Sequence, residues 1–505
     1  MRMTDAERIP VIIGGGEVND RPEDPDAGLD SLGLMVAALR EAEKDCRTGP
    51  LLAEIDSLAI VDQISFRALG NLCAPLAAAI GADPKVKYQS DAPHGDTPIR
   101  LLNEAANRIG AGEIRLAAIV GGEALRTAAG RAAKRAAGED KSYNAVRKVA
   151  TRQEPNYAQS HGLIAPVDVY PLYENAGRAA YGQSLAEAQA ESAAIWSAMS
   201  EVAAQNPAAW IRDPVTAQAM LSPANGNRPI AFPYSKLMVA NASVNQGAAF
   251  IVTSLAEARR RKVREDRIIY VGMGAAAKEA GSILKRDRYD RSVSMDMAIQ
   301  RTMALNEVTV DELDFVELYS CFPCVPKMAR RTLGWGLDFP LSVVGGLTFG
   351  GGPIANYMSH AVVRMMHRLR DYGLHGFLFA NGGFATDNHC IILSNMPIEA
   401  AHFPQDFDYQ GEADRVRGPV PPLDEGYVGP AVIETYTVFY GRDGQPRDGV
   451  VVARTPAGAR TLAHVDAGDA DLIAFLTDGR VEPVGTAGTI GEDSGGRRCW
   501  ASGGQ

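Results

Sequence analysis

The sequence has no long apolar run, few cysteines and no excess of positive charge, and each absence excludes a class of protein. No segment approaches the roughly 18–20 consecutive apolar residues of a membrane-spanning helix. The formal net charge is −10, which argues against a broad contact surface for nucleic acid or an anionic membrane. We therefore expect no nucleic-acid partner and no membrane span.

The six cysteines, at positions 46, 73, 321, 324, 390 and 499, do not form the pattern of a disulfide framework. The N-terminus also lacks the basic and then apolar segments of a signal peptide. We expect a reduced, cytoplasmic protein. Cys321 and Cys324 form a CxxC motif, but no second such pair completes four zinc ligands, so we expect no metal site.

The 505 residues, 46% hydrophobic and 22% charged, are enough for two or three globular domains. Strand and helix patterns alternate, which is typical of an α/β fold. The second half repeats the order of the first and ends in 375–383 as the first ends in 115–122, which predicts an internal duplication. The predicted elements are strand 9–15, helix 29–44, strand 57–61, helix 103–113 and strand 115–125, and then strand 266–276, helix 295–308 and strand 314–320.

The middle segment, 126–235, is long and irregular, and we expect it to form a lid over a site. Its first part, 126–152, is rich in lysine and arginine. This part lies either near an anionic ligand or on a solvated helix face.

The composition changes near residue 400, and 401–428 has the polar, proline-rich character of a linker. Beyond it, 432–454 predicts a β-hairpin around a turn-forming Asp-Gly. Residues 461–466, 472–477 and 480–490 predict three more strands. We expect a small C-terminal β domain at 429–505, a partly open barrel that is OB-like, with its last dozen residues frayed. The preceding parts are predicted as two halves, 1–265 and 266–400.

Five segments of the chain follow one another in an informative order. They are AGEIRLAAIVGGEA (111–124), PYSKLMVANASVNQGAAFIV (233–252), VELYSCFP (316–323), GGLTFGGGPIANYMSH (345–360) and FANGGFATDNHC (379–390). Glycine after a strand is common, so the order of the segments carries the argument. In this order they resemble the thiolase superfamily over about residues 8–398. Within it the chain is similar to the sterol-carrier-protein-type thiolases and to a type 1 thiolase-like group with an additional C-terminal β domain, whose relatives are called acetyl-CoA acetyltransferases.

The resemblance implies a duplicated thiolase fold of five αβαβα layers with a coenzyme A thioester as substrate or ligand. It implies no permanently bound cofactor and a role in lipid metabolism. Thiolases commonly form homodimers, so a homodimer is possible, and the C-terminal domain is a possible site for a protein partner.

The residues that perform thiolase chemistry are replaced in this chain. The acyl-accepting cysteine of the family falls at or beside Gly95, where the nearest polar side chains are His94, Asp96 and Thr97. These three are expected to contact substrate. A covalent acyl-cysteine at the usual position is excluded.

Tyr319 stands where thiolases place an asparagine or histidine that holds a catalytic water. Its hydroxyl can donate to an oxyanion or act as a base, or the ring can form a wall of the pocket. Cys321 falls where the sterol-carrier type has a cysteine that is not the nucleophile. We expect Cys321 to be structural, although it stays a candidate for a substitute nucleophile.

The thiolase G-H-P triplet is Gly351-Gly352-Pro353 here, so the activating histidine is missing. The backbone N–H groups of Gly351 and Gly352 are still expected to face an anion.

The second thiolase cysteine falls at Phe379 or Ala380, beside Asn381, whose amide is able to bind a carbonyl oxygen. Asn356 and His360, spaced i and i+4, share one helix face. His360 and His389 are the remaining candidates for proton transfer, or they are core histidines.

The leading interpretation is an acyl-CoA-binding enzyme that acts on a carbon–carbon bond next to a thioester without a nucleophilic cysteine, by retro-aldol or Claisen-type chemistry. Tyr319, His360 or His389 would serve as acid or base. The first alternative is an acyl-CoA C-acyltransferase with Cys321 or Cys390 as substitute nucleophile. The second is a non-catalytic acyl-CoA-binding protein.

Overall fold

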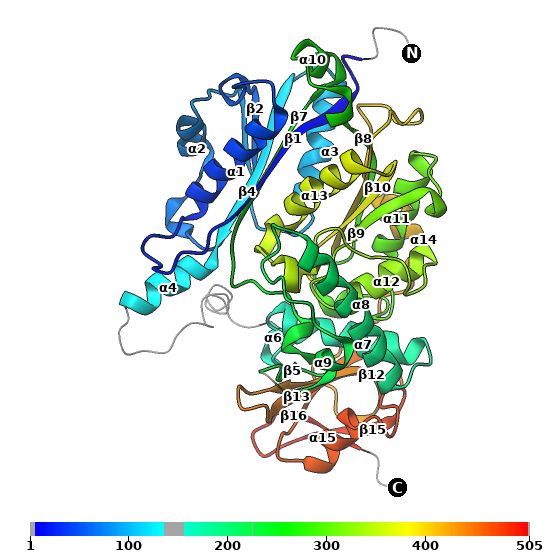
Figure 1. Ribbon diagram of the computed structural model, residues 1–505. Coiled ribbons are helices and arrows are strands. Elements are labelled where there is room, and N and C mark those ends of the chain that lie inside the picture. The colour runs from blue at the N-terminus through cyan, green and yellow to red at the C-terminus, as the bar shows by residue number, and fades with distance from the viewer. Residues whose placement is uncertain (1–5, 136–155, 225, 503–505) are drawn as a thin grey trace.

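The computed structural model describes residues 6–135, 156–224 and 226–502. Nine strands form one sheet in the order β3-β2-β4-β7-β1-β8-β11-β10-β9. Its two parts meet only through two antiparallel residue pairs, Val11 with Tyr270 and Ile12 with Ile269. The sheet is therefore two separate half-sheets joined at one corner (Figure 1).

The first half-sheet contains five strands, and its central strands are apolar along their whole length. Every residue of β4 and β7 is buried, as expected for strands covered on both faces. Strands β2, β3 and β4 are parallel, and β7 is antiparallel to both β4 and β1. The strands are β1 (Pro10–Asn19), β2 (Ser57–Ile60), β3 (Val86–Gln89), β4 (Leu116–Ala124) and β7 (Asn245–Ser254).

The second half-sheet repeats this arrangement with four strands. In both halves the first strand lies beside the last one, β1 beside β7 and β8 beside β11. The predicted duplication is thus confirmed at the level of the fold. Among the described residues, the second half has no counterpart of β3. The strands are β8 (Ile269–Lys278), β9 (Leu313–Leu318), β10 (His375–Gly382) and β11 (Asp387–Ser394).

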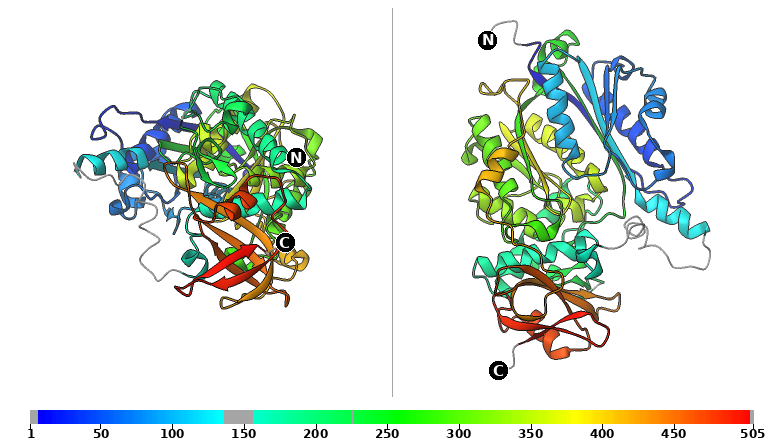
Figure 2. Two further views of the ribbon diagram at one scale, coloured as in Figure 1. Left: turned by 90° about the horizontal axis from the view of Figure 1, so that it is seen from below. Right: turned by 180° about the vertical axis from the view of Figure 1, so that it is seen from behind.

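Two helices, α3 (Thr97–Gly110) and α13 (Tyr357–Asp371), lie between the half-sheets, and other helices cover the outer faces (Figures 1 and 2). Both are apolar on several sides, and Ile99, Leu102, Met358 and Val362 are completely buried. Burying a side chain of this size contributes about 1.5–3 kcal/mol. The expected five layers are therefore present. The outer helices are α1 (Ser31–Cys46), α2 (Cys73–Ile80), α10 (Leu255–Arg260), α11 (Val293–Leu305) and α12 (Cys324–Leu333).

The described residues of 156–235 in the middle segment lie between the two half-sheets and the C-terminal domain (Figure 1). Its two short strands extend the sheet of the C-terminal domain, because β5 pairs with β12. The basic stretch 126–152 begins on α4 (Leu125–Arg135), and its remainder, 136–152, lies outside the described residues. The elements are α6 (Tyr157–Ser160), α7 (Pro166–Ala180), α8 (Leu185–Gln205), α9 (Ala217–Leu221), β5 (Pro229–Ala231) and β6 (Tyr234–Ser235).

The C-terminal domain is a closed barrel of five strands, whereas the sequence predicted a partly open one. The ring closes because β12 pairs with both β13 and β15, and β16 pairs with both β14 and β15. The last strand includes residues that were predicted to be frayed, and 472–477, predicted as a strand, is helical. The elements are β12 (Gly429–Tyr440), β13 (Pro446–Arg454), β14 (Arg460–Val465), α15 (Ala470–Thr477), β15 (Ala487–Glu492) and β16 (Arg498–Ser502).

The segment 401–428, which has the composition of a linker, runs along the body of the protein. It contains α14 (Gln410–Val416), and Arg417 pairs with the buried Glu279 at 2.8 Å. No helix among the described residues is long and apolar enough to cross a membrane.

Candidate functional site

Three distant parts of the chain meet at Gly95, just before the N-terminus of α3. A β-carbon added at Gly95 would lie 2.2 Å from the main-chain oxygen of Asn381 and 2.5 Å from the hydroxyl oxygen of Tyr319. Both distances are far shorter than a van der Waals contact, so only glycine fits there. The tyrosine hydroxyl therefore occupies the space into which a side chain at position 95 would extend.

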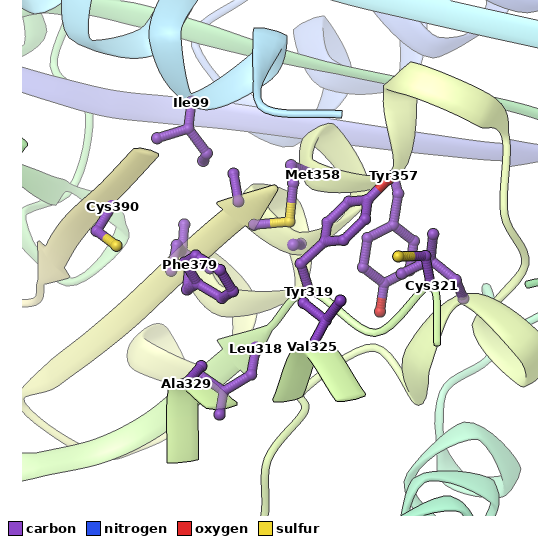
Figure 3. Close-up of a cluster of buried hydrophobic side chains, with 14 of the residues drawn as sticks. Ile99, Leu318, Tyr319, Cys321, Val325, Ala329, Tyr357, Met358, Phe379 and Cys390 are labelled. Carbon is purple, nitrogen blue, oxygen red and sulfur yellow. The ribbon is translucent and has the colours of Figure 1, made fainter. Parts of the chain in front are cut away.

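Tyr319 follows the end of β9 and is 6% exposed. Burial, followed by the nearby Cys321 and Asp96, raises the pKa of its hydroxyl well above the ordinary value. The hydroxyl is therefore protonated at neutral pH and is a hydrogen-bond donor rather than a base. Its ring meets that of Tyr357 edge to face, with centroids 5.8 Å apart, and Figure 3 shows the two rings beside Cys321.

A buried carboxylate, Glu317, lies behind this pair of tyrosines. It is completely buried and accepts a hydrogen bond of 2.7 Å from the Tyr357 hydroxyl. The Ser342 hydroxyl donates at 2.8 Å, and the backbone N–H groups of Val343 and Val344 donate at 2.9 and 3.1 Å. Burial raises the pKa of Glu317 to about 7 in spite of these four donors.

This raised pKa predicts a pH-dependent stability. Between the ordinary pKa of 4.5 and a pKa of about 7, the unfolded chain releases the Glu317 proton while the folded protein keeps it. The free energy of unfolding therefore falls as pH rises, by about 2 kcal/mol from about pH 5 to about pH 8. Glu317→Gln has no carboxyl group to titrate. We therefore expect its free energy of unfolding, measured in urea at the two pH values, to fall by about 2 kcal/mol less than that of the unaltered protein. Equal slopes for both proteins would contradict this assignment.

Charged residues gather on the solvent side of Gly95. His94 Nδ1 lies 3.5 Å from Asp387 Oδ2, and Lys278 Nζ lies 3.0 Å from Asp387 Oδ1. The hydrogen bond with Asp387 raises the pKa of His94. Burial opposes ionisation of Asp387, but His94 and Lys278 hold its pKa well below the ordinary value. The half-exposed His94 therefore has its Nδ1 beside a permanent carboxylate, which orients the ring and favours its protonated form; the neutral ring has the arrangement of a general base.

Asp96 completes this cluster and is 7% exposed. Burial, followed by the charge of Asp387, raises the pKa of Asp96. The ligand atoms of His94, Asp96 and Asp387 all lie within 4.8 Å of one another, a spacing that three metal ligands can adopt. Asp387 is already satisfied by Lys278 and by the Thr386 hydroxyl at 3.0 Å. Asp387 therefore makes both ion pairs of this cluster. Thr97, beside it, is buried at the first position of α3.

The two histidines expected to transfer protons make other contacts. His389 Nε2 lies 2.7 Å from the Asn103 side chain, which is about 9 Å further along α3 than Thr97. Burial, followed by Arg100 and Lys278, lowers the pKa of His389 to about 3, so it is a neutral core histidine. This placement does not match the expected catalytic role.

His360 faces the first half-sheet. Its Nδ1 lies 2.7 Å from Glu17 Oε1 on β1, and its Nε2 is buried with no partner among the described residues. Asn356, one turn earlier, also has a buried amide without a partner in the described chain. Its Oδ1 would lie 2.2 Å from a β-carbon at Gly121. The two residues share a helix face, as predicted from their spacing, but that face is turned to β1 and β4.

The amide of Asn381 is occupied, in contrast to the expectation that it binds a carbonyl oxygen. Its Oδ1 accepts from the Tyr170 hydroxyl at 3.1 Å, and its Nδ2 donates to Asn388 Oδ1 at 2.9 Å. In the glycine-rich segment, the Gly352 N–H donates to the Asn241 carbonyl at 2.9 Å, so it is not free to face an anion. Gly351 has a φ of 106° and no room for a side chain, since a β-carbon would lie 2.1 Å from Gln246 Oε1.

The cysteines considered as substitute nucleophiles are buried thiols. Burial raises the pKa of Cys321 to about 12, and burial alone raises the pKa of Cys390 well above its ordinary value. The thiolate is the nucleophilic form, so both side chains are poor nucleophiles at neutral pH. Figure 3 shows Cys321 beside the tyrosine pair and Cys390 on a different strand.

Sequence reasoning missed the hydrogen bond between Tyr357 and Glu317 and the ion pair between His94 and Asp387. The first joins residues 40 positions apart, and the second joins residues from opposite halves of the chain. A polar residue within the strand pattern of 314–320 was the available signal for Glu317. No local pattern connects His94 to Asp387.

Comparisons with known proteins agree with this fold. Residues 410–495 match the family described as thiolase-like protein type 1 additional C-terminal domain. A monomeric SCP2-thiolase-like protein type 1 from Mycobacterium smegmatis is 29% identical, with a TM-score of 0.82 over 98% of this chain and 100% of that protein. A comparison with curated proteins gave no match.

Structures of lower sequence identity align with 77% of this chain and have the same fold. The Ltp2–ChsH2(DUF35) aldolase has a TM-score of 0.58 at 16% identity and is covered over 98% of its chain. Human mitochondrial 3-ketoacyl-CoA thiolase has a TM-score of 0.58 at 14% identity and is covered over its whole chain. The fold that this chain shares with them therefore extends over nearly their whole length.

The fold is a thiolase scaffold, and the match of Gly95 to the acyl-accepting cysteine stays a prediction. The chain has the thiolase fold, and its residues 410–495 match the additional C-terminal domain of thiolase-like proteins of type 1. The homodimer and the protein partner expected from the resemblance stay predictions.

Proposed function

We propose that this chain is an acyl-CoA-binding enzyme that cleaves or forms a carbon–carbon bond next to a thioester without a cysteine intermediate. The observation that supports it is the Tyr319 hydroxyl, 2.5 Å from where a β-carbon at Gly95 would lie. A protonated hydroxyl at that point is suited to hold a thioester oxygen as it becomes an enolate. No acyl group needs to be transferred to the protein.

Retro-aldol cleavage of a 3-hydroxyacyl-CoA uses the groups at this site. His94, oriented by Asp387, removes the proton of the 3-hydroxyl group. The electron pair of that O–H bond forms a carbonyl at C3, and the C2–C3 bond breaks. Its electrons form the enolate of the shortened thioester, whose oxygen accepts a hydrogen bond from Tyr319. Protonation at C2 by the imidazolium gives an acyl-CoA and an aldehyde or ketone.

An acyl-CoA C-acyltransferase with a substitute nucleophile fits less well, because the pKa values of Cys321 and Cys390 are both raised. Non-catalytic acyl-CoA binding is favoured by one observation. The Asn381 carbonyl and the Tyr319 hydroxyl fill the space beside Gly95, which would keep an acyl chain from reaching the N-terminus of α3.

The test is product formation from a panel of 3-hydroxyacyl-CoA thioesters. We expect Tyr319→Phe to lower kcat by about 100-fold or more, because removing one oxyanion donor commonly costs that much. The affinity for CoA should change little, since the hydroxyl acts mainly in the transition state. Tyr372→Phe, at a tyrosine that is 56% exposed, is the matched control and should retain full turnover.

Two outcomes would overturn the proposal. Full turnover by Tyr319→Phe would remove the tyrosine from the chemistry. Absence of any aldehyde or ketone across the panel, with CoA still bound, would favour the non-catalytic alternative.

A further inference from the structure

Two arginines lie over the ring of one tryptophan in the first half, and a third arginine lies close enough to act on their charge. The guanidinium carbon of Arg21 lies 4.2 Å from the centroid of the Trp210 ring, and that of Arg126 lies 5.8 Å from it. Arg212 follows two residues after the tryptophan. All three arginine side chains are exposed, whereas Trp210 is 6% exposed. We call these four residues the arginine cluster.

The positive charges of the arginine cluster are not neutralised by carboxylates. No ion pair to Arg21, Arg126 or Arg212 is found within the described parts of the chain. Arg21 donates to the carbonyls of Ala209 and Trp210, and Arg212 donates to the Ala204 carbonyl at 3.2 Å. Burial, followed by the charges of Arg126 and Arg212, lowers the pKa of Arg21. The three cations therefore repel one another, and an anion would relieve that repulsion.

The other described basic side chains of α4 that make contacts are held by the protein itself. Arg131 donates to the carbonyls of Pro25 and Gly28 at 3.1 and 2.7 Å. Lys134 pairs with Asp24 and Asp26. Among these side chains of α4, only Arg126 belongs to the arginine cluster. The positive charge that α4 adds to the cluster therefore comes from one end of the helix. It stands out in a protein with a net charge of −10.

The arginine cluster is joined to the glycine-rich segment by main-chain hydrogen bonds. The Trp210 N–H donates to the Gly350 carbonyl at 3.1 Å, and the Ile211 N–H donates to the Phe349 carbonyl at 2.7 Å. Gln246 Nε2 donates to the same Gly350 carbonyl and to Asn19 Oδ1, both at 2.9 Å. The cluster therefore lies beside the glycines that precede α13.

We infer that the arginine cluster binds the phosphate groups at the nucleotide end of a coenzyme A thioester. This inference rests on the proposed function, which requires a CoA thioester to reach the site at Gly95 and Tyr319. A guanidinium group can donate two parallel hydrogen bonds to one phosphate group, and it remains charged at every physiological pH. Three unneutralised guanidinium groups also offset the repulsion between an acidic protein and a polyanionic ligand.

Isothermal titration calorimetry tests this inference without requiring turnover. The ligands are CoA, adenosine 3′,5′-bisphosphate and pantetheine, and the variant is Arg21→Ala/Arg126→Ala in the full chain. We expect the double variant to bind CoA and the bisphosphate about 10-fold or more weakly, because charge-assisted hydrogen bonds are lost. Pantetheine affinity should not change. Arg447→Ala, at an exposed arginine of β13, is the matched control and should behave as the unaltered protein.

The charge of the cluster gives a second readout. The affinity of the unaltered protein for CoA should fall with rising salt, and that of the double variant should fall less. Arg126→Glu replaces a positive by a negative charge at an exposed position, so this variant should fold normally. It should weaken CoA binding more than removal of the positive charge does. Equal CoA affinity in the double variant and the Arg447 control would overturn the inference. If CoA binding falls as expected but no thioester is cleaved, the cluster stands and the proposed chemistry fails.

Discussion

Replacing Gly95 with alanine is expected to lower the free energy of unfolding by about 3 kcal/mol. The added methyl group would lie 2.2 Å from the main-chain oxygen of Asn381 and 2.5 Å from the Tyr319 hydroxyl. The tyrosine can turn away, but the carbonyl belongs to β10 and cannot move without breaking the sheet. Urea or thermal unfolding measures the effect.

Gly281→Ala is the matched control, because a β-carbon at Gly281 would meet no atom within 4 Å. We expect that variant to be neutral or slightly stabilised, since alanine reduces the entropy of the unfolded chain. Equal stability of the two variants would show that position 95 has room for a side chain. The account of Tyr319 as the group that fills this space would then be wrong.

Arg460→Met is expected to cost about 3–5 kcal/mol, because it removes two charge-assisted hydrogen bonds from the Glu434 carboxylate and leaves two buried carbonyls without their donor. Arg460 is completely buried. It pairs with Glu434 at 2.6 Å and donates to the carbonyls of Leu284 and Arg286 at 2.7 and 2.6 Å. These two carbonyls belong to the second half, so the arginine joins the barrel to the body. Denaturant unfolding measures the loss.

Arg454→Met is the matched control for this experiment. Arg454 pairs with the same carboxylate at 2.9 Å, but its side chain is 32% exposed, and exposed pairs contribute about 0–1 kcal/mol. A loss for Arg460→Met as small as that of the control would contradict the view that the barrel is an integral part of the fold. It would favour a tethered domain that is free to bind a partner.

Most strands of the two half-sheets could be predicted, because strands such as β4 are buried along their whole length and have an apolar sequence. The errors fall in the C-terminal domain. Residues 472–477 form part of α15, in which Asp469 accepts a hydrogen bond from the Leu472 N–H as the N-cap. A six-residue apolar run alone does not distinguish a strand from a short helix. The cap was the missing criterion.

Strand β16 shows a different limit. Its residues, Arg498–Ser502, have no alternating pattern, and the terminal position suggested fraying. Its main-chain hydrogen bonds come from β15 and from β14, which is more than thirty residues away. Closure of the barrel therefore depends on non-local pairing, which a local pattern cannot reveal.

The candidate site, like the fold, could be predicted only in part. The family motifs placed Gly95, Tyr319 and Asn381 in one site, and the structure brings them together. The roles of the histidines could not be predicted, because their partners are distant in the chain. His389 contacts Asn103 across 286 positions, and His360 contacts Glu17 across 343. Whether a histidine is a base or a core residue depends on these contacts.

The most direct test of the central claim is the mass of the intact protein in acid-quenched samples taken while a 3-hydroxyacyl-CoA is being cleaved. The account predicts that an aldehyde or ketone accumulates while the protein keeps its unmodified mass. An acyl adduct that forms and decays at the rate of turnover, located on Cys321 or Cys390, would contradict it. That result would instead establish acyl transfer to a substitute nucleophile.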